Sequence, residues 1–363
     1  MRFLKPLFIE VTEIPEYFKR EHLPSLNGFR AVSVIIVVIF HLSLSNSYLY
    51  KTVFNGSLGV NVFFVLSGFL ITSLLLKEKA ATGTISLRFF YIRRVLRILP
   101  AAYLCIIVVT VLNYFFHLGV SYLYLSAAAL FIVDFEFLSK IKTPFVSHYW
   151  SLSVEEQFYF LFPIIVKKNF KLFVLFILFI VFILPLLFTL QYFIPEINQG
   201  VLFGLTHFLI KFQGIAVGCL FSILCFKNVL RKSKFKYKMV LKIFITLAIF
   251  AIVHTGDINM ISVYTNLVIS ALIGWLLILN LFQTTDVYFK FLNLKYVSQI
   301  GALSYSIYIW HLLILNLMIK PKFIATYPIS LIVIFLVGWL SYNYWEKPFM
   351  KFKSKFSIIK DRM

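Results

Sequence analysis

The sequence predicts an all-α, polytopic membrane protein of about ten transmembrane helices, with both termini in the cytoplasm. Three observations predict this fold class. Apolar residues make up 61% of the 363 residues and charged residues only 13%, against about a quarter charged in soluble domains. The apolar runs are continuous, whereas β-barrel strands alternate apolar and polar residues. Lys and Arg are concentrated on one side of the predicted helices, as is usual in membrane proteins.

Ten apolar segments are predicted to cross the bilayer, because about 20 apolar residues in a helix cover its hydrocarbon core. The stretch 121–133 is apolar but too short to cross, so it is predicted to be an interfacial or re-entrant piece. No repeat or soluble appendage is visible, so residues 1–363 are predicted to form a single transmembrane domain. The predicted spans are 28–47, 57–76, 99–117, 149–166, 172–190, 202–226, 239–254, 258–282, 297–319 and 325–345.

The distribution of Lys and Arg predicts the orientation of the chain. With the N-terminus inside, 27 of the 35 Lys and Arg residues fall in cytoplasmic loops and ends, and 5 fall on the opposite side. This bias predicts a cytoplasmic segment over 1–26 and a basic cytoplasmic tail over 346–363. The net charge of +21 is then explained by contact with anionic lipid. We therefore expect a multi-pass protein of the inner (plasma) membrane with no nucleic-acid partner.

Two ionisable residues lie in the first predicted span, where such groups are costly and are therefore functional candidates. Arg30 and His41 are eleven residues apart, so they share a helix face and are separated by about 16 Å along the axis. Arg30, at the cytoplasmic edge, suits a phosphate, and His41, near mid-depth, suits proton transfer. Each has a structural alternative, which is an interfacial anchor for Arg30 and a helix–helix hydrogen bond for His41.

Three further arginines, Arg93, Arg94 and Arg97, precede the third predicted span. Arg93 and Arg97 are four residues apart and share a helix face, which Arg94 flanks. The cluster predicts either a polyphosphate clamp or ordinary anchoring to lipid phosphates. In the second span, Ser67 and Gly68 provide either close helix packing or a narrow path for an extended ligand.

The fourth predicted span opens with HYWSLSVEEQFY, which places two carboxyl groups at its outer end. Glu155 is predicted to be the partner that orients a histidine or assists it as a base. The three cysteines lie in apolar runs without the spacing of metal ligands. No metal site and no disulfide framework are therefore expected.

These residues fall in motifs that resemble acyltransferase family 3, the bacterial membrane O-acyltransferases of surface glycans. The resemblance covers nearly the whole chain and includes six motifs in the family's order. It adds Tyr305 and His311, which lie in the fifth motif. The motifs are Arg30-x10-His41, FFVLSGFLI, RRVLRILP, HYWSLSVEEQFY, GALSYSIYIWH (301–311) and YWEKPF (344–349).

The chain departs from the family pattern at several positions. Asn61 stands where the family usually has Asp, and Lys211 and Gln213 stand where Arg and Asp are usual. The soluble hydrolase-like domain that is fused to some relatives is not expected here. A second transfer step would therefore need a separate extracytoplasmic transferase.

The resemblance implies that an acyl group, commonly acetyl, moves from cytoplasmic acyl-CoA to a hydroxyl of a carbohydrate or lipid-linked glycan outside the cytoplasm. Acyl-CoA is then a substrate, and no bound cofactor is expected. The implied acyl-CoA-binding residues are Arg30, Ser67, Gly68, Arg93, Arg94 and Arg97. The residues expected on the acceptor side or in support are His148, Trp150, Ser151, Glu156, Tyr305 and His311.

Two mechanisms remain open, with His41 and Glu155 as the catalytic residues in both. His41 acts as general base for the sugar hydroxyl, or it accepts the acyl group and passes it on. The alternative function is a transporter or flippase of a glycan or acyl donor, which would also carry intramembrane ionisable residues. Such proteins usually show internal repeats, which this sequence lacks. A structural scaffold would not need an Arg and a His on one helix face.

Overall fold

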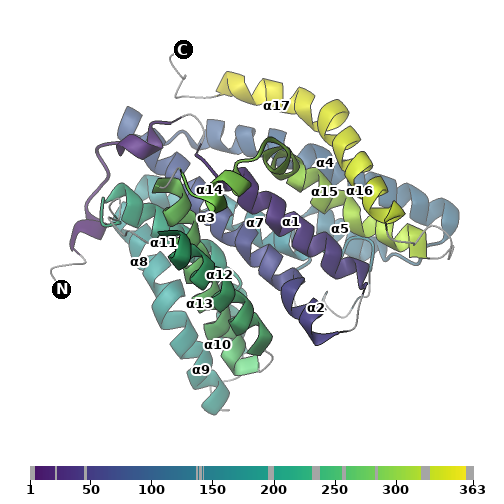
Figure 1. The fold of residues 1–363 in the computed structure, drawn as a ribbon, viewed down its shortest axis with the longest axis horizontal. Coiled ribbons are helices and arrows are strands. Elements are labelled where there is room, and N and C mark those ends of the chain that lie inside the picture. Colours follow the sequence, from purple (N-terminus) through teal and green to yellow (C-terminus); the bar gives the residue numbers. More distant parts are fainter. Residues whose placement is uncertain are drawn as a thin grey trace.

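The computed structural model of the protein is helical and contains no strand within the residues that it describes (Figure 1). This confirms the predicted all-α class. Parts of the predicted cytoplasmic ends, and residues 325–327 of the last predicted span, lie outside the described residues. The described residues are 5–20, 23–44, 47–135, 138, 141, 143–194, 200–230, 238–255, 259–282, 285–319 and 328–356.

The helices follow one another with short connections in the described part of the chain. Two π-helical turns, Phe179–Ile183 and Ser341–Glu346, join α8 to α9 and α16 to α17. The first half of the chain forms α1 (Leu26–Leu42), α2 (Tyr48–Val53), α3 (Gly56–Thr82), α4 (Leu87–Phe116), α5 (Tyr122–Ala129) and α7 (Tyr149–Lys168). The second half forms α8 (Phe170–Leu178), α9 (Leu184–Phe193), α10 (Gly200–Ile210), α11 (Gln213–Phe226), α12 (Lys238–Thr255), α13 (Asn259–Phe282), α14 (Val287–Leu292), α15 (Lys295–Ile319), α16 (Ile329–Leu340) and α17 (Lys347–Lys353).

Six helical stretches within the described residues are long and apolar enough to cross a membrane. The pair α10 and α11 is bent by 56° and would make a seventh, so the predicted span 202–226 is broken rather than continuous. The stretch predicted to be too short to cross forms α5, which has only eight residues. The six stretches are Tyr48–Thr82, Leu87–Phe116, Phe170–Phe193, Ser262–Phe282, Lys295–Leu317 and Ile329–Lys353.

Two helices extend well beyond the spans that hydropathy predicts for them. The span predicted over 57–76 belongs to α3, which continues to Thr82, and the span predicted over 99–117 belongs to α4, which begins at Leu87. The α3 extension is rich in Lys, Glu and Ala and the α4 extension contains four Arg, and all four residue types favour helix. The arginine cluster therefore lies on a helix that continues into the membrane, and the helix fixes the directions of its side chains.

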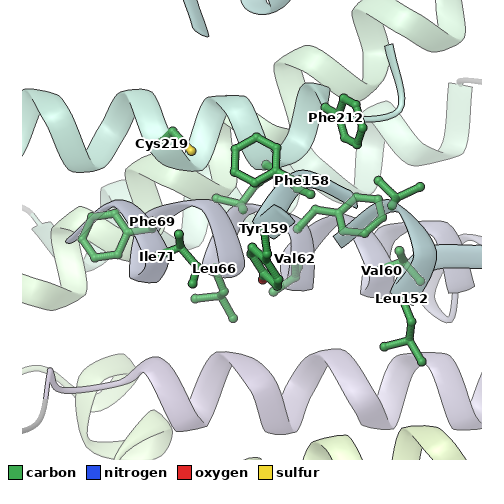
Figure 2. Packing of buried hydrophobic residues seen from close by; sticks show 14 of the residues in the cluster. Val60, Val62, Leu66, Phe69, Ile71, Leu152, Phe158, Tyr159, Phe212 and Cys219 are labelled. Atoms are coloured by element: carbon green, nitrogen blue, oxygen red, sulfur yellow. The ribbon is translucent and has the colours of Figure 1, made fainter. Parts of the chain in front are cut away.

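The centre of the fold is the contact between α3 and α11, where two glycines allow the backbones to meet. A Cβ atom on Gly68 would lie 1.9 Å from the carbonyl oxygen of Ile215, and one on Gly218 would lie 2.1 Å from that of Val65. Figure 2 shows the same contact, with Phe69 of α3 beside Cys219 of α11. Gly68 is thus a helix-packing residue, as small residues in membrane helices commonly are. Its predicted role in acyl-CoA binding stays a prediction.

We expect Gly68→Ala to destabilise the protein by about 1 to 3 kcal/mol, because the added methyl group must displace backbone atoms of α11. Gly204→Ala is the matched control, since a Cβ atom at Gly204 of α10 meets nothing within 4 Å. This control should be neutral or slightly stabilising, because alanine is the better helix former. Thermal unfolding in detergent measures both. Equal stability of Gly68→Ala and the unmodified protein would contradict the packing role.

The N-terminal segment packs at one end of the helix bundle. Tyr17 donates a hydrogen bond to the carbonyl oxygen of Cys225, and burial raises the pKa of the Tyr17 hydroxyl. Phe18 stacks on Phe226 with ring centroids 4.3 Å apart. Glu10 forms an ion pair of 2.8 Å with Lys79 near the end of α3. The N-terminal segment, the α3–α4 connection and the end of α11 therefore lie on one side, which agrees with the sidedness that the basic residues predict.

The first helix lies between α15 and α3. Ser33, fully buried, donates a hydrogen bond to the carbonyl oxygen of Gly59 on α3. At the start of the helix, the backbone N–H of Ser25 donates to Asn293 at 2.8 Å. These contacts set the rotation of α1, which decides what Arg30 and His41 face.

Candidate active site

A cavity of about 90 Å³ lies where α1, α3, α4, α7 and α15 meet. Its charged lining consists of three arginines and two glutamates, and we call it the arginine cavity. Ser67, Ser151 and Ser304 add hydroxyl groups, and Tyr159, Tyr305 and Tyr308 add phenol rings. The charged residues are Arg30, Arg94, Arg97, Glu155 and Glu156.

The three arginines come from two helices. Arg30 lies in the second turn of α1, and Arg94 and Arg97 are three residues apart on α4, so they share a helix face. The Arg94 guanidinium lies over the Tyr159 ring, 4.4 Å from its centroid. Among the described residues, none of the three guanidinium groups forms a hydrogen bond or an ion pair within 4 Å. Their N–H donors are therefore available to an anionic ligand.

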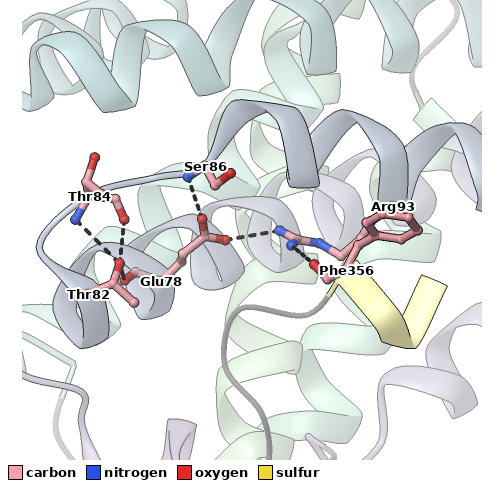
Figure 3. A network of polar contacts seen from close by, with 6 residues as sticks. All are labelled: Glu78, Thr82, Thr84, Ser86, Arg93 and Phe356. Atoms are coloured by element: carbon pink, nitrogen blue, oxygen red, sulfur yellow. Dashed lines mark hydrogen bonds and ion pairs between the residues drawn. The ribbon is translucent and has the colours of Figure 1, made fainter.

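Arg93, which the sequence groups with the clamp, does not line the arginine cavity. Its guanidinium forms an ion pair with Glu78 at 3.0 Å and donates to the carbonyl oxygen of Phe356 at 2.8 Å (Figure 3). The other carboxylate oxygen of Glu78 accepts a hydrogen bond from the backbone N–H of Ser86 at 2.6 Å. These contacts tie α3, α4 and the C-terminal segment together, and the predicted acyl-CoA contact of Arg93 stays a prediction.

Glu155 lies in the arginine cavity, in contact with hydroxyl groups. Its carboxylate accepts hydrogen bonds from Ser67 at 3.1 Å and from Tyr159 at 3.2 Å. It also interacts electrostatically with Arg30 and Arg94. The sequence predicts Glu155 as the partner of a histidine, and that contact does not occur among the described residues. Ser67 does line the cavity, because it points about 100° away from the neighbouring Gly68, which contacts α11.

His41 lies apart from the arginine cavity, in a cluster of three imidazole rings. Its Nδ1 atom is 2.9 Å from the carbonyl oxygen of Val37. Its ring centroid is 5.0 Å from that of His311, which is 5.1 Å from that of His148. His148 and His311 are buried, and both ring nitrogens of His148 and the Nε2 atom of His311 have no hydrogen-bond partner. Among the described residues, no group of three or more His, Cys, Asp or Glu side chains is arranged to hold a metal ion.

Tyr308 connects the arginine cavity with the histidine cluster. It lines the cavity, and its ring packs against His148 and His311 with centroids 5.3 Å from each. The hydroxyl groups of Tyr308 and Ser151 form a hydrogen bond of 2.6 Å. The sequence reasoning named Ser151 and both histidines but missed Tyr308, although it stands in the same motif as Tyr305 and His311. It also missed Tyr159, whose ring lies under the Arg94 guanidinium.

The remaining predicted residues fall into two groups. Tyr305 lines the arginine cavity and donates to the carbonyl oxygen of Ile98 at 2.7 Å, and Glu156 lines the cavity directly. Trp150 is 40% exposed and packs edge-on against Phe64 at 6.1 Å. It lines a separate cavity, so it is not in the arginine cavity.

A second cavity, of about 240 Å³, adjoins the arginine cavity. The two cavities share Arg30 and Arg97 as lining residues. The second also contains Arg20 of the N-terminal segment and Lys77 of α3. These residues lie at the end of the bundle where the N-terminal segment packs, so a cationic cleft leads from that end to the arginine cavity. We call it the basic cleft.

Two departures from the family pattern, Lys211 in the turn between α10 and α11 and Gln213 at the start of α11, have separate surroundings. Lys211 forms an ion pair with Asp134 at 3.3 Å, and Gln157 donates to the same carboxylate at 2.7 Å. Gln213 is buried, and its side-chain nitrogen has no partner. Lys211 therefore has an acidic partner that the sequence reasoning did not identify, and it does not form an ion pair with residue 213.

The fold and the site define a class, which is a helical membrane protein with a buried cationic cavity beside a cluster of histidines. A family model described as an acyltransferase domain matches residues 23–343, so the chain belongs to acyltransferase family 3. The family that the motifs resemble is thereby confirmed. No solved structure matches the chain.

Three relatives illustrate the similarity. A Staphylococcus aureus protein is 30% identical over 93% of this chain and 58% of its own length. The peptidoglycan O-acetyltransferase OatA of Listeria monocytogenes is 28% identical over 95% of this chain and 59% of its own length. The O-acetyltransferase OatA of Staphylococcus aureus is 29% identical over 93% of this chain and 59% of its own length. The chain thus spans less than two thirds of each relative.

Proposed function

We propose that the protein is a membrane O-acyltransferase that moves an acetyl group from cytoplasmic acetyl-CoA to a hydroxyl of an extracytoplasmic carbohydrate. One observation carries this proposal, namely that three guanidinium groups without protein partners converge on one buried cavity. Membership of the acyltransferase family and the relatives named as O-acetyltransferases support the same class of reaction.

The basic cleft is the proposed entrance for the donor. Acyl-CoA has a phosphorylated nucleotide at one end and a neutral arm that carries the thioester at the other. Arg20, Lys77 and Arg97 would hold the phosphates, because guanidinium groups bind phosphate oxygens through paired N–H bonds. The arm would continue past Arg30 into the arginine cavity. Ser67 and Tyr159, which are held by Glu155, line its path.

The proposed reaction is attack by a sugar hydroxyl on the thioester carbonyl carbon. The new C–O bond forms, the C–S bond breaks, the thiolate of CoA leaves, and a base takes the hydroxyl proton. A neutral imidazole of His41 could take this proton directly, or it could first accept the acyl group and pass it on. Glu155 lies in the arginine cavity, so its proposed role becomes positioning of the donor. Tyr308 and Ser151 separate it from the histidines.

The proposed membrane arrangement follows the charge bias. We propose a single domain of about ten spans in the inner membrane, with both termini and the basic cleft on the cytoplasmic side. The histidine cluster then lies nearer the outer surface, where a carbohydrate or lipid-linked glycan would arrive. A separate extracytoplasmic transferase is a further proposed partner for any later step.

We expect cysteine labelling in intact cells to report this orientation. Lys51 of α2 and Lys290 of α14 are both exposed, and the charge bias places them on opposite sides. Lys51→Cys should react with an impermeant thiol reagent, and Lys290→Cys should react only after the cells are permeabilised. The three native cysteines are buried, so they contribute little background. Reversed labelling would place the basic cleft outside and exclude a cytoplasmic donor.

The proposed activity is tested by incubating membranes that contain the protein with acetyl-CoA labelled in the acetyl group. Label should appear in an ester on carbohydrate, and mild base should release it as acetate. Membranes with a His41→Ala variant at equal protein level are the control. A transporter would leave the label in CoA whichever variant is used, so absence of labelled ester from membranes with folded protein would sink the proposal.

A further inference from the structure

A third cavity, of about 440 Å³, opens beside the arginine cavity between α4, α7 and the segment that follows α5. We call it the lateral cavity. Its walls are largely apolar and aromatic, with Val95 and Leu99 of α4 facing Leu130 and Phe160. The lateral cavity shares three lining residues with the arginine cavity, namely Arg94, Glu156 and Tyr159. The two spaces therefore meet at these side chains.

Hydrogen bonds across the rim show that the lateral cavity is a framed opening rather than a packing defect. Each wall is joined to its neighbour through a side chain that itself lines the cavity. In addition, the Oε1 atom of Gln157 is buried without a hydrogen-bond partner. The bonds run from the Tyr91 hydroxyl to Phe160 O at 2.7 Å, from the Tyr103 hydroxyl to Ala129 O at 3.1 Å, and from Gln157 Nε2 to Phe131 O at 2.9 Å.

The lateral cavity opens toward the surroundings of the helix bundle. Val95 is 48% exposed, Leu130 69% and Phe160 65%. Only a third of the most apolar stretch of α4 is buried within the protein, so much of that stretch is open to the lipid of a membrane. An opening framed by exposed apolar side chains on a membrane helix is in contact with hydrocarbon rather than water.

The position of Arg94 along α4 matches the level of lipid headgroups. A helix needs about 20 residues to cross the hydrocarbon core. Counted back from the end of α4 at Phe116, that length begins close to Arg97. Arg94 is then at the boundary, and Tyr103 lies nine residues deeper, about 14 Å along the axis. The cavity thus runs from the headgroup level into one leaflet, in the direction of an acyl chain.

The charges at the inner end of the lateral cavity favour an anion. Arg94 has no hydrogen bond or ion pair among the described residues. The carboxylates of Glu156 and, in the arginine cavity, of Glu155 oppose this charge. Arg30 and Arg97 also lie in the arginine cavity, so three guanidinium groups stand against two carboxylates. Positive charge therefore predominates at the inner end of the lateral cavity.

We propose that the lateral cavity binds one anionic phospholipid of the adjoining leaflet. Its acyl chain lies along Val95, Leu99 and Phe160, and its phosphate reaches Arg94 from the membrane side. Because Arg94 also lines the arginine cavity, the bound lipid and the donor of the proposed function share this residue. The leaflet is the cytoplasmic one in the proposed orientation. This assignment and the sharing of Arg94 with the donor rest on the proposed function, and the lipid site itself does not.

The test is native mass spectrometry of the full chain, released from micelles that contain equal amounts of phosphatidylglycerol and phosphatidylcholine. The unmodified protein should retain phosphatidylglycerol in preference. Arg94→Gln should lower this preference about tenfold, which corresponds to the loss of one charge-assisted contact. Equal retention of the two lipids by the unmodified protein would overturn the proposal.

Two further substitutions test the lateral cavity without changing a charge. Leu99→Trp and Leu130→Trp fill the lateral cavity from opposite walls, and each should remove the retained lipid. The Leu130 side chain is 69% exposed, so its substitution should not disturb packing in the protein core. Val111→Trp is the matched control, since Val111 is 47% exposed on the same helix and lines none of the three cavities. If both Leu99→Trp and Leu130→Trp retain the lipid, the lipid binds outside the lateral cavity.

Binding of acetyl-CoA, measured separately on the same proteins, distinguishes the two proposals. Leu99 lines only the lateral cavity, so Leu99→Trp should lose the lipid and still bind acetyl-CoA. Preference for phosphatidylglycerol without any binding of acetyl-CoA would overturn the proposed function and leave the lipid site standing. Binding of acetyl-CoA without preference for phosphatidylglycerol would overturn the lipid site and leave the proposed function standing.

Discussion

Substitution of Arg97 by alanine is expected to lower the affinity for acetyl-CoA about tenfold to a hundredfold. Arg97 lines both the basic cleft and the arginine cavity, so its guanidinium is positioned to hold the donor's phosphates where the arm leaves the cleft. A hydrogen bond to a charged group contributes about 1.5 to 3 kcal/mol, which sets the size of the loss. Arg97→Lys should restore little of it, because an ammonium group lacks the paired N–H geometry.

Arg88→Ala is the matched control for this prediction. Arg88 lies on the same helix, is exposed and lines neither cavity. Its loss removes one positive charge without removing a donor from the site, so affinity should change little. Binding of radiolabelled acetyl-CoA to purified protein measures all three variants. If Arg97→Ala and Arg88→Ala bind equally well, the arginines are anchors for lipid phosphates, and the donor site lies elsewhere.

Substitution of His41 by glutamine is expected to reduce acyl transfer about a hundredfold to ten-thousandfold, the usual range for a lost acid–base group. Binding of acetyl-CoA should stay near normal, because His41 lines neither the arginine cavity nor the basic cleft. Glutamine keeps a polar group of similar reach but cannot take a proton at neutral pH. The labelled-acetyl assay, normalised to folded protein, measures the transfer.

His207→Gln supplies a control with the same local geometry. The Nδ1 atom of His207 lies 3.0 Å from the carbonyl oxygen of Phe203, four residues earlier. His41 makes the same kind of contact with Val37 at 2.9 Å. If that contact were the whole role of His41, the two variants should behave alike. Transfer at the unmodified rate in His41→Gln would show that His41 is a structural residue.

Much of the fold could be predicted because hydropathy is local. An apolar run of about 20 residues is a membrane helix whatever surrounds it, and α13 and α15 lie close to the runs predicted over 258–282 and 297–319. Helix ends were harder to predict where charged residues flank the apolar run. The predicted spans of α3 and α4 stop at the first Lys or Arg, although charged residues continue a helix well.

The candidate site could be predicted only in part, because the direction of a side chain depends on helix rotation. Arg93 and Arg97 share a face by spacing, yet Arg94 and Arg97 face the cavity, because Glu78 and Phe356 hold Arg93. The partner of Glu155 could not be predicted either. Its carboxylate meets Ser67, which is 88 residues away in the chain.

The sequence by itself determined the helical class, the family and the residue types available for chemistry, because these depend on composition and on the order of short motifs. Only the tertiary structure decided which of those residues meet. It separated His41 from Glu155 and joined Tyr308 to both the arginine cavity and the histidine cluster. The physical reason is that close contacts such as Gly68 against Ile215 set how each helix is rotated. No single helix contains that information.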